Sequence, residues 1–497
     1  MTGMGRMAGI LAGGAVMVAA CLVPGTAQAA PPKITWHQCA DDRSVQCGTL
    51  GVPIDRSRPQ AGSIKIAVAR LRAADPKRRL GTLLVNPGGP GGSGVDMVLD
   101  RAGLSKQVRQ RYDIVGFDPR GVGASNPVSC GKVGKAPRDF PRNQAEFAAR
   151  KAFGAKLYQA CRARTGPLYD HLGQTDVALD MDAIRDALGE QKISFYGISY
   201  GTWLGQRYAE LFPWRLSRLT LDSTMDHSVA GAGRFSADEA RGLEEGYRQF
   251  AKWCPTSKYC ALRGKNPVKV LDALMVRAER GTLHEIDDPK VRLEVFGLAR
   301  MVQTTMYDPL AWAELSEELR ELSRQKVRKV AKVDTTGDHD GMFSGILCAD
   351  WAFPVRDYKE LAAVRAESRR AAPHVRLNPL ADDAFIACLG RPAKPLDPQR
   401  PSFVKFAPPS LIVSGTGDPA TVRPWAVNVN RQTSRSALLT YQGTGHGVYA
   451  LSPCARTAVD AYLLTGRQPK AGATCPAVRP DFSQAYARRA PQGPKRF

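Results

Sequence analysis

Hydrophobic and polar residues along the first half of the chain form two alternating patterns. Short aliphatic runs predict strands at 48–55, 63–71, 81–87, 112–118, 193–198 and 216–222, and hydrophobic residues at helical spacing predict helices at 144–163, 176–188 and 202–212. Strands that alternate with helices are typical of a mostly parallel sheet with helices on both faces. We therefore expect an α/β fold.

The alternation stops near residue 225, and helical patterns dominate from there to about residue 400. They predict helices at 236–252, 267–279, 291–306, 311–331 and 357–371. Strands resume at 410–415 and 437–441, followed by a helix at 454–465. We therefore predict that an α/β core at 30–224 and 402–497 is interrupted by a helical lid at 225–401.

The N-terminus has the pattern of a secretory signal peptide. Arg6 precedes the apolar run 8–23, and the small-residue sequence Ala27-Gln28-Ala29 follows it. We predict a signal peptide at 1–29, cleaved after Ala29, and no membrane span elsewhere. An alternative is a lipobox ending at Cys21, which would anchor the secreted protein through a lipid.

Cysteine usage agrees with secretion. The chain has 11 cysteines, of which Cys21 lies in the predicted signal peptide, so an even number remains in an oxidising compartment. Spacing leaves the connectivity open, and pairing of sequence neighbours is one possibility: Cys39/Cys47, Cys130/Cys161, Cys254/Cys260, Cys348/Cys388 and Cys454/Cys475. No C-x-x-C sequence occurs, so we expect no metal site.

The chain is strongly basic, with a formal net charge of +23. Its Lys and Arg residues are scattered, and neither zinc-finger spacing nor an RNA-binding signature accompanies them. We therefore expect no nucleic-acid partner. Loose association with anionic cell-wall polymers would follow from the charge alone.

A glycine-rich sequence, NPGGPGGSG, follows the strand predicted at 81–87. Gly89, Gly91 and Gly94 match the dinucleotide-binding spacing G-x-G-x-x-G, and Asp113 or Asp118 would be its ribose-binding acid. A secreted chain has little access to such a cofactor, and other strands precede this one. We therefore favour a different role for the loop and expect no cofactor.

A nucleophile elbow supplies that role. Gly197-Ile198-Ser199-Tyr200-Gly201 has the pattern G-x-S-x-G and lies between a predicted strand and a predicted helix. An elbow serine needs an oxyanion hole, made by the N–H of the next residue, Tyr200, and by an N–H of an earlier loop. We assign the second donor to Gly89.

An acid and then a histidine follow the serine along the chain, which is the order found in folds that use a nucleophile elbow. Asp418 comes after the strand at 410–415, and His446, between two glycines, comes after the strand at 437–441. We predict a Ser199–His446–Asp418 triad that works through an acyl-enzyme. The remaining histidines are interpreted as ordinary surface or packed residues: His37, His171, His227, His284, His339 and His374.

These motifs resemble those of the secreted tripeptidyl aminopeptidases and prolyl-aminopeptidase-like α/β-hydrolases of actinobacteria. The similar segments are NPGGPGGSG, DPRGVGAS at 118–125, GISYGTWLGQRYAELFP at 197–213, GTGDPAT and GTGHGVY. The resemblance implies an α/β-hydrolase fold with a helical lid, the same triad, and cleavage of short peptides from a free N-terminus. One departure is that the family's D-P-x-T-P sequence has its second proline delayed to Pro424.

An exopeptidase must bind the substrate's α-ammonium group, for which a carboxylate under the lid is the natural partner. Asp226 and Asp350 are candidates, although both also fit structural roles, and Trp351 and Phe353 are candidates for an apolar pocket. The sequence at 338–341 is interpreted as a surface turn. The alternatives are an esterase with the same triad and a binding protein with a decayed site.

Overall fold

The computed structural model describes residues 33–329, 341–480 and 482. These residues belong to one unit, Pro32–Phe497. The predicted signal peptide, Cys21 and positions 338–340 lie outside the described residues, so the secretion and lipid-anchor hypotheses stay predictions.

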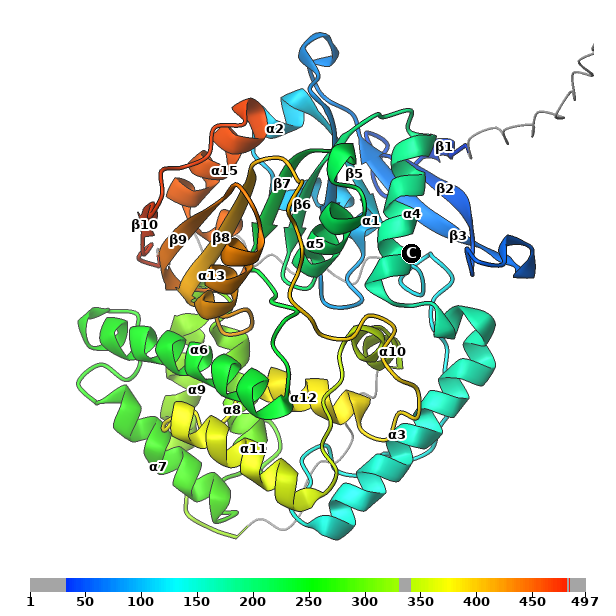
Figure 1. The fold of residues 1–497 in the computed structure, drawn as a ribbon. Coiled ribbons are helices and arrows are strands. Elements are labelled where there is room, and N and C mark those ends of the chain that lie inside the picture. The colour runs from blue at the N-terminus through cyan, green and yellow to red at the C-terminus, as the bar shows by residue number, and fades with distance from the viewer. Residues whose placement is uncertain (1–32, 330–340, 481, 483–497) are drawn as a thin grey trace, which may run out of the picture. The chain divides into compact units, whose positions relative to one another are not determined.

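A mixed sheet lies in the upper half of the view in Figure 1, and a group of helices lies below it. The strands run in the spatial order β1-β2-β3-β5-β4-β6-β7-β8-β9-β10. Pairing is antiparallel from β1 to β5 and parallel from β5 through β4 to β10. The strands are β1 (Thr35–Gln38), β2 (Gln46–Pro53), β3 (Ser63–Leu71), β4 (Gly81–Asn86), β5 (Tyr112–Phe117), β6 (Ile193–Ile198), β7 (Leu216–Asp222), β8 (Ser410–Gly417), β9 (Ser436–Thr444) and β10 (Thr474–Pro476).

Helices cover both faces of the sheet because the parallel strands are apolar on both sides. In β4, Leu84 packs into the core cluster on one face, whereas Leu83 and Val85 pack into the cluster on the other. One face carries α4 (Gln174–Ala187), α5 (Gly201–Leu211) and α13 (Arg423–Gln432), and the other carries α1 (Gly94–Leu99), α2 (Lys106–Arg111), α14 (Val448–Leu451) and α15 (Pro453–Thr465). The predicted α/β-hydrolase fold class is confirmed.

Seven helices lie in the described part of the segment between β7 and β8, which we call the helical insertion (Figure 1). They are α6 (Ala232–Trp253), α7 (Pro267–Glu279), α8 (Val295–Thr305), α9 (Trp312–Arg324), α10 (Gly341–Asp350), α11 (Tyr358–Ala371) and α12 (Pro379–Cys388). Helix α3 (Gln144–Thr165) precedes the insertion in sequence but contacts α10, α11 and α12. The domain division at residues 224 and 401 stays a prediction.

Several elements were not expected from the sequence. Strands β1 and β10 are short edge strands, and α10 and α12 fall in segments for which no helix was predicted. The helix expected at 311–331 is shorter, because α9 ends at Arg324.

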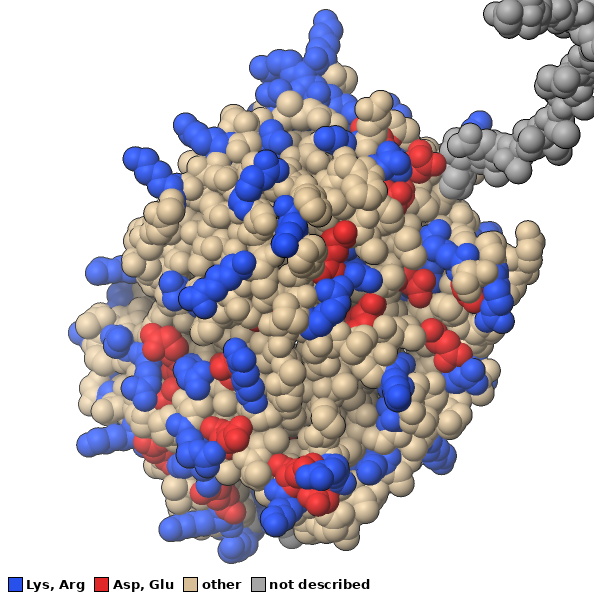
Figure 2. Space-filling view, in the orientation of Figure 1, with Lys and Arg blue, Asp and Glu red and all other residues tan. Residues whose placement is uncertain are grey.

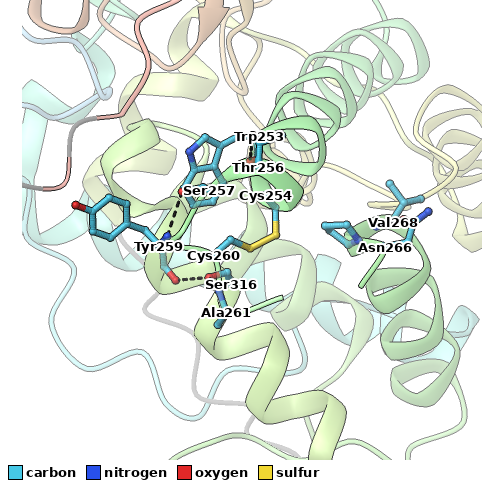
Figure 3. Close-up of a disulfide and its surroundings, with 12 residues drawn as sticks. Trp253, Cys254, Thr256, Ser257, Tyr259, Cys260, Ala261, Asn266, Val268 and Ser316 are labelled. Atoms are coloured by element: carbon cyan, nitrogen blue, oxygen red, sulfur yellow. Dashed lines mark hydrogen bonds between the residues drawn. A yellow bond between two sulfur atoms is a disulfide. The ribbon is translucent and has the colours of Figure 1, made fainter. Parts of the chain in front are cut away.

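Five disulfides join the pairs of sequence neighbours, one of the connectivities that the spacing left open: Cys39–Cys47, Cys130–Cys161, Cys254–Cys260, Cys348–Cys388 and Cys454–Cys475. Figure 3 shows the third, which closes the turn after α6. Beside it, the Ala261 N–H donates to Ser316 Oγ of α9 at 2.9 Å. This turn therefore connects α6 to α9.

Basic side chains occur over the whole face shown in Figure 2, with acidic side chains among them. Among the described helices, none combines the length and apolarity needed to cross a bilayer. The described residues also contain no His, Cys, Asp and Glu cluster suited to a metal ion.

Candidate active site

Ser199 lies in a sharp turn between β6 and α5. Its φ of 57° is in the left-handed region, a strain of about 1–3 kcal/mol for a non-glycine residue that surrounding contacts must offset. The Ser199 N–H donates to the Asp222 carbonyl at 3.0 Å. A Cβ at Gly197 would lie 2.5 Å from the Gly201 carbonyl oxygen, so the glycines of the motif permit this close approach.

The glycine-rich loop after β4 packs directly against this turn. A Cβ at Gly88 would lie 2.5 Å from the Ile198 carbonyl oxygen and 2.8 Å from the Tyr200 nitrogen. Gly89, with a φ of 111°, lines the same pocket as Ser199 and Tyr200. The loop therefore lies beside Ser199 and Tyr200, and its role in an oxyanion hole stays a prediction.

The two acids of the dinucleotide interpretation already bind protein donors. Asp118 is buried and accepts hydrogen bonds from Ser93 Oγ, from the Val95 N–H in the first turn of α1 and from the Ala124 N–H. Asp113 accepts from the Ala73 N–H and pairs with Arg79. Both carboxylates therefore make structural contacts within the chain.

His446 and Asp418 are in direct contact. His446 Nδ1 lies 2.9 Å and 3.1 Å from the two Asp418 oxygens. Asp418 is fully buried and also accepts hydrogen bonds from the N–H groups of Ala420 and Thr421, each at 2.9 Å. Because Nδ1 faces the carboxylate, Nε2 is the ring nitrogen left to accept a proton.

Each partner shifts the pKa of the other. Burial alone would raise the pKa of Asp418, but the His446 charge and the hydrogen bonds to the carboxylate outweigh it and lower that pKa. Burial alone would lower the pKa of His446, but the negative charges of Asp418 and Asp222 raise it. The arrangement therefore favours an imidazolium beside a carboxylate.

The delayed proline of the Asp418 loop leaves the acid in place. Pro424 occupies the first turn of α13, where a missing N–H costs no helical hydrogen bond. Thr421 retains its contact with the acid, since its Oγ1 donates to Asp418 Oδ2 at 3.0 Å.

The residues that follow three of the parallel strands lie at the carboxyl end of the sheet. Ser199 follows β6, Asp418 follows β8 and His446 follows β9, and β7 lies between β6 and β8. The end of β7 joins them: the Asp222 carbonyl accepts from the Ser199 N–H, and Ser223 Oγ accepts from the N–H of Gly447 at 2.9 Å. Carboxyl ends of parallel strands are where such folds build their sites.

One pocket contains Ser199 together with residues of the helical insertion. Its wall is formed by Gly89, Pro90, Ser199, Tyr200, Met225, Phe235, Glu239, Phe343, Leu347, Leu380, Ala384, Ala420 and Thr421. Most of these are apolar, and Glu239 is the acidic residue among them. The insertion therefore supplies both an apolar surface and one carboxyl group beside Ser199.

Glu239 was not identified from the sequence. It is 1% exposed, and its Oε2 has no hydrogen-bond partner among the described residues. Burial, and then the charge of Asp418, raise its pKa well above the ordinary value. A signal was present: Glu239 lies four residues after Phe235 and four before Leu243, so it is a charged residue on the apolar face of a helix.

Asp226 and Asp350 are not part of this pocket. Asp226 accepts hydrogen bonds from Ser228 and from the side-chain amide of Asn428. Asp350 accepts from the Gln174 N–H at 2.9 Å and from the Tyr200 hydroxyl. Both carboxylates are buried and already hold protein donors, which fits the structural roles.

The aromatic candidates for the apolar pocket lie behind its wall. Trp351 and Phe353 are buried and are absent from the lining of the pocket that contains Ser199. Phe353 packs against Phe235, which does line it, at a ring separation of 5.0 Å.

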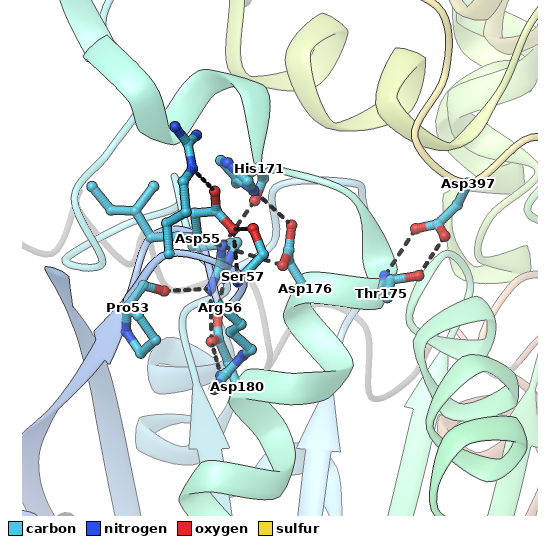
Figure 4. Close-up of polar contacts among 12 residues, drawn as sticks. Pro53, Asp55, Arg56, Ser57, His171, Thr175, Asp176, Asp180 and Asp397 are labelled. Atoms are coloured by element: carbon cyan, nitrogen blue, oxygen red, sulfur yellow. Dashed lines mark hydrogen bonds and ion pairs between the residues drawn. The ribbon is translucent and has the colours of Figure 1, made fainter. Parts of the chain in front are cut away.

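Figure 4 shows a second group of polar contacts, between residues that follow β2 and residues in and just before α4. The carboxylate of Asp180 in α4 pairs with Arg56 and with the fully buried Arg120, both at 2.7 Å. Nearby, His171 Nδ1 lies 3.3 Å from Asp176. These contacts fix the β2–β3 hairpin to α4 and agree with an ordinary role for His171.

Fold and site together define an α/β-hydrolase with a serine on a nucleophile-type turn. The family described as TAP-like protein matches residues 374–475. The tripeptidyl aminopeptidase of Streptomyces lividans is 30% identical over 481 residues, covering 90% of this chain and 88% of that protein. The serine protease Hip1 of Mycobacterium tuberculosis is 30% identical over 517 residues, covering 94% of this chain and 96% of the relative.

The chain therefore belongs to the tripeptidyl aminopeptidase family, as its motifs indicated, and it is a serine peptidase. Carboxylesterase B of Mycobacterium tuberculosis is 29% identical over 505 residues and covers 94% of both chains. The solved structure of a proline iminopeptidase from Mycobacterium smegmatis is 18% identical, covers 84% of this chain and 97% of that one, and has a TM-score of 0.40.

Proposed function

We propose that the protein is a secreted exopeptidase that removes short peptides from the free N-terminus of peptide substrates. Ser199 is the nucleophile, His446 the general base and Asp418 the acid that orients it. The five disulfides support an oxidising, extracellular location. Loose association with anionic cell-wall polymers remains part of the hypothesis, on the net charge of +23.

The proposed reaction proceeds in two halves. Ser199 Oγ attacks the scissile carbonyl carbon while His446 Nε2 takes the hydroxyl proton, and the N–H groups of Gly89 and Tyr200 stabilise the oxyanion. His446 then gives the proton to the leaving amine, which departs and leaves an acyl-enzyme. Water attacks the ester with His446 again as base, and the peptide acid leaves.

The observation that carries the aminopeptidase assignment is Glu239. A buried carboxyl group without a partner at Oε2 is costly, and proteins retain such groups where a ligand completes them. The pocket places it with Ser199 among apolar side chains. An α-ammonium group supplies both the charge and the hydrogen-bond donors that Glu239 lacks, so we assign the substrate's N-terminus to it.

The test compares peptidyl p-nitroanilides with a free and an acetylated N-terminus. We expect the acetylated substrates to lose at least about tenfold in kcat/KM, since a missing charge-assisted hydrogen bond costs about 1.5–3 kcal/mol. Glu239→Gln should remove most of this preference and leave the acetylated substrates unaffected. Equal turnover of free and acetylated substrates by the wild type would overturn the assignment.

Glu244→Gln is the matched control for that substitution. Glu244 lies on the same helix and is also buried, but it accepts the N–H groups of His374 and Val375 and does not line the pocket. Its substitution should leave the preference for a free N-terminus intact.

An esterase remains the second candidate, favoured by the similarity to carboxylesterase B. The same triad would act on esters, and an ester lacks the ammonium group that Glu239 would bind. Activity on p-nitrophenyl esters that exceeds activity on every free peptide substrate, and that Glu239→Gln leaves unchanged, would favour the esterase.

A further inference from the structure

The last residue of β7, Asp222, holds the loop that carries His446. Its fully buried carboxylate accepts the Val448 N–H at Oδ1 and the Tyr449 N–H at Oδ2, each at 2.9 Å. The next residue, Ser223, accepts the Gly447 N–H at 2.9 Å. The three N–H groups that follow His446 are therefore all bound by two consecutive residues, the last residue of β7 and the one after it.

Asp222 also holds the nucleophile turn. Its carbonyl oxygen accepts the Ser199 N–H at 3.0 Å. The main-chain carbonyl of Asp222 thus binds the turn that carries Ser199, and its side-chain carboxylate binds the loop that carries His446. A shift of Asp222 would move the proposed nucleophile and base relative to each other, and small misplacements of reacting groups are costly.

The charge of Asp222 also acts on His446. Its carboxyl group accepts a third hydrogen bond, from the Tyr196 hydroxyl at 3.0 Å. Burial raises the pKa of this carboxyl group, and the hydrogen bonds from Tyr449, Tyr196 and Val448 oppose that rise. Among the described residues, the titratable groups that face His446 are Asp418, Asp222 and Tyr307, whose ring centroid lies 5.0 Å from the imidazole. Those that face Asp222 are Tyr196 and His446.

We propose that Asp222 is a positioning residue for the peptidase reaction, which fixes the His446 loop against the Ser199 turn and adds negative charge beside the imidazole. This inference rests on the proposed triad. Asp418 contacts the ring nitrogen, whereas Asp222 acts through the backbone and through its charge. The site therefore uses two buried carboxylates in two different ways.

The experiment is the pH profile of kcat/KM, whose acid limb reports the ionisation of the free-enzyme base. Asp222→Asn removes the charge and keeps the size. We expect kcat to fall about 10- to 100-fold, since a misplaced reacting group costs on that order, and the acid limb to move to lower pH. Ser223→Ala removes only a neutral acceptor, so it should lower kcat without moving the limb.

A lower kcat with an unmoved limb in Asp222→Asn would reduce Asp222 to a structural residue and overturn the proposal. If that variant does not fold, Tyr196→Phe provides the second test. It removes one donor from the Asp222 carboxyl group and so changes the charge or the placement of that group beside His446, which should move the limb; an unmoved limb overturns the proposal. Retained activity in Ser199→Ala would instead disprove the triad itself, so the two failures are distinguishable.

Discussion

Tyr200, the residue after the proposed nucleophile, donates its hydroxyl hydrogen to the carboxylate of Asp350 at the end of helix α10. The Tyr200 ring also packs beside Trp351, with centroids 5.5 Å apart. Asp350 lies two residues after Cys348, whose disulfide joins α10 to α12. The helical insertion is therefore attached to the turn that carries Ser199, and it does more than cover the pocket.

Removal of this contact should impair both stability and catalysis. Tyr200→Phe leaves a buried carboxylate with one donor fewer, which costs about 1–3 kcal/mol of the free energy of unfolding. Because the Tyr200 N–H is a proposed oxyanion donor, kcat should fall more than KM rises. Denaturant unfolding and steady-state kinetics measure the two effects. A double-mutant cycle of Tyr200→Phe and Asp350→Ala should give an interaction free energy between the two side chains. Strictly additive losses of stability would contradict the contact.

The proposed nucleophile gives the simplest prediction. Ser199→Ala should keep the fold and lose at least about 10³-fold in kcat, as loss of a triad member does elsewhere. Thermal unfolding and turnover of a peptidyl p-nitroanilide by the purified variant measure this. Turnover near the wild-type rate would contradict the mechanism.

The sequence predicted the parts of the site that chemistry constrains strongly. Ser199 lies in a motif with a steric reason for each glycine, and Asp418 and His446 follow strands in a fixed order. The buried acid Glu239 was missed because an insertion helix was interpreted by its apolar spacing alone. Helix α10 was missed because its residues are apolar on nearly every face, so no helical period shows, and it is buried throughout most of its length.

Two other short elements, β10 and α12, were missed for a different reason. Strand β10 is three residues long and exists because Cys475 pairs with Cys454 and the chain lies against β9. Helix α12 begins at an Asn378 cap followed by a proline, a start signal that was present although no helix was predicted there. Short elements that depend on tertiary contacts carry little sequence pattern of their own.

The disulfides should differ in their contribution to stability. Cys348–Cys388 spans 40 residues and Cys254–Cys260 spans 6. In the chain-entropy description, closing these loops restricts the unfolded state by about 4 and about 2 kcal/mol respectively. Paired Cys→Ser variants, compared by denaturant unfolding, should show the larger loss for Cys348–Cys388. Equal losses would show that native contacts, rather than loop length, decide the contribution.

Glu239 should make the free enzyme less stable at neutral pH. Its pKa in the folded protein is raised by burial and by the Asp418 charge, so the unfolded chain ionises first as the pH rises. The stability contribution of this group is therefore complete below the unfolded pKa of about 4.3 and is lost progressively as the pH rises above it. Each tenfold difference in proton affinity between the folded and unfolded states corresponds to about 1.4 kcal/mol. Gln does not titrate and escapes this loss.

Glu239→Gln should consequently unfold at a higher temperature than the wild type at pH 7–8, and the difference should shrink as the pH falls toward 4. The same variant should bind free N-termini more weakly, so stability and substrate recognition move in opposite directions, as expected of a group retained for a ligand. Thermal unfolding across this pH range is the measurement, with Glu244→Gln as the control. That control replaces a charged acceptor of two N–H groups with a neutral amide oxygen, so it should not raise the unfolding temperature. A difference between Glu239→Gln and the wild type that stays constant with pH would contradict the buried, ligand-binding carboxyl group.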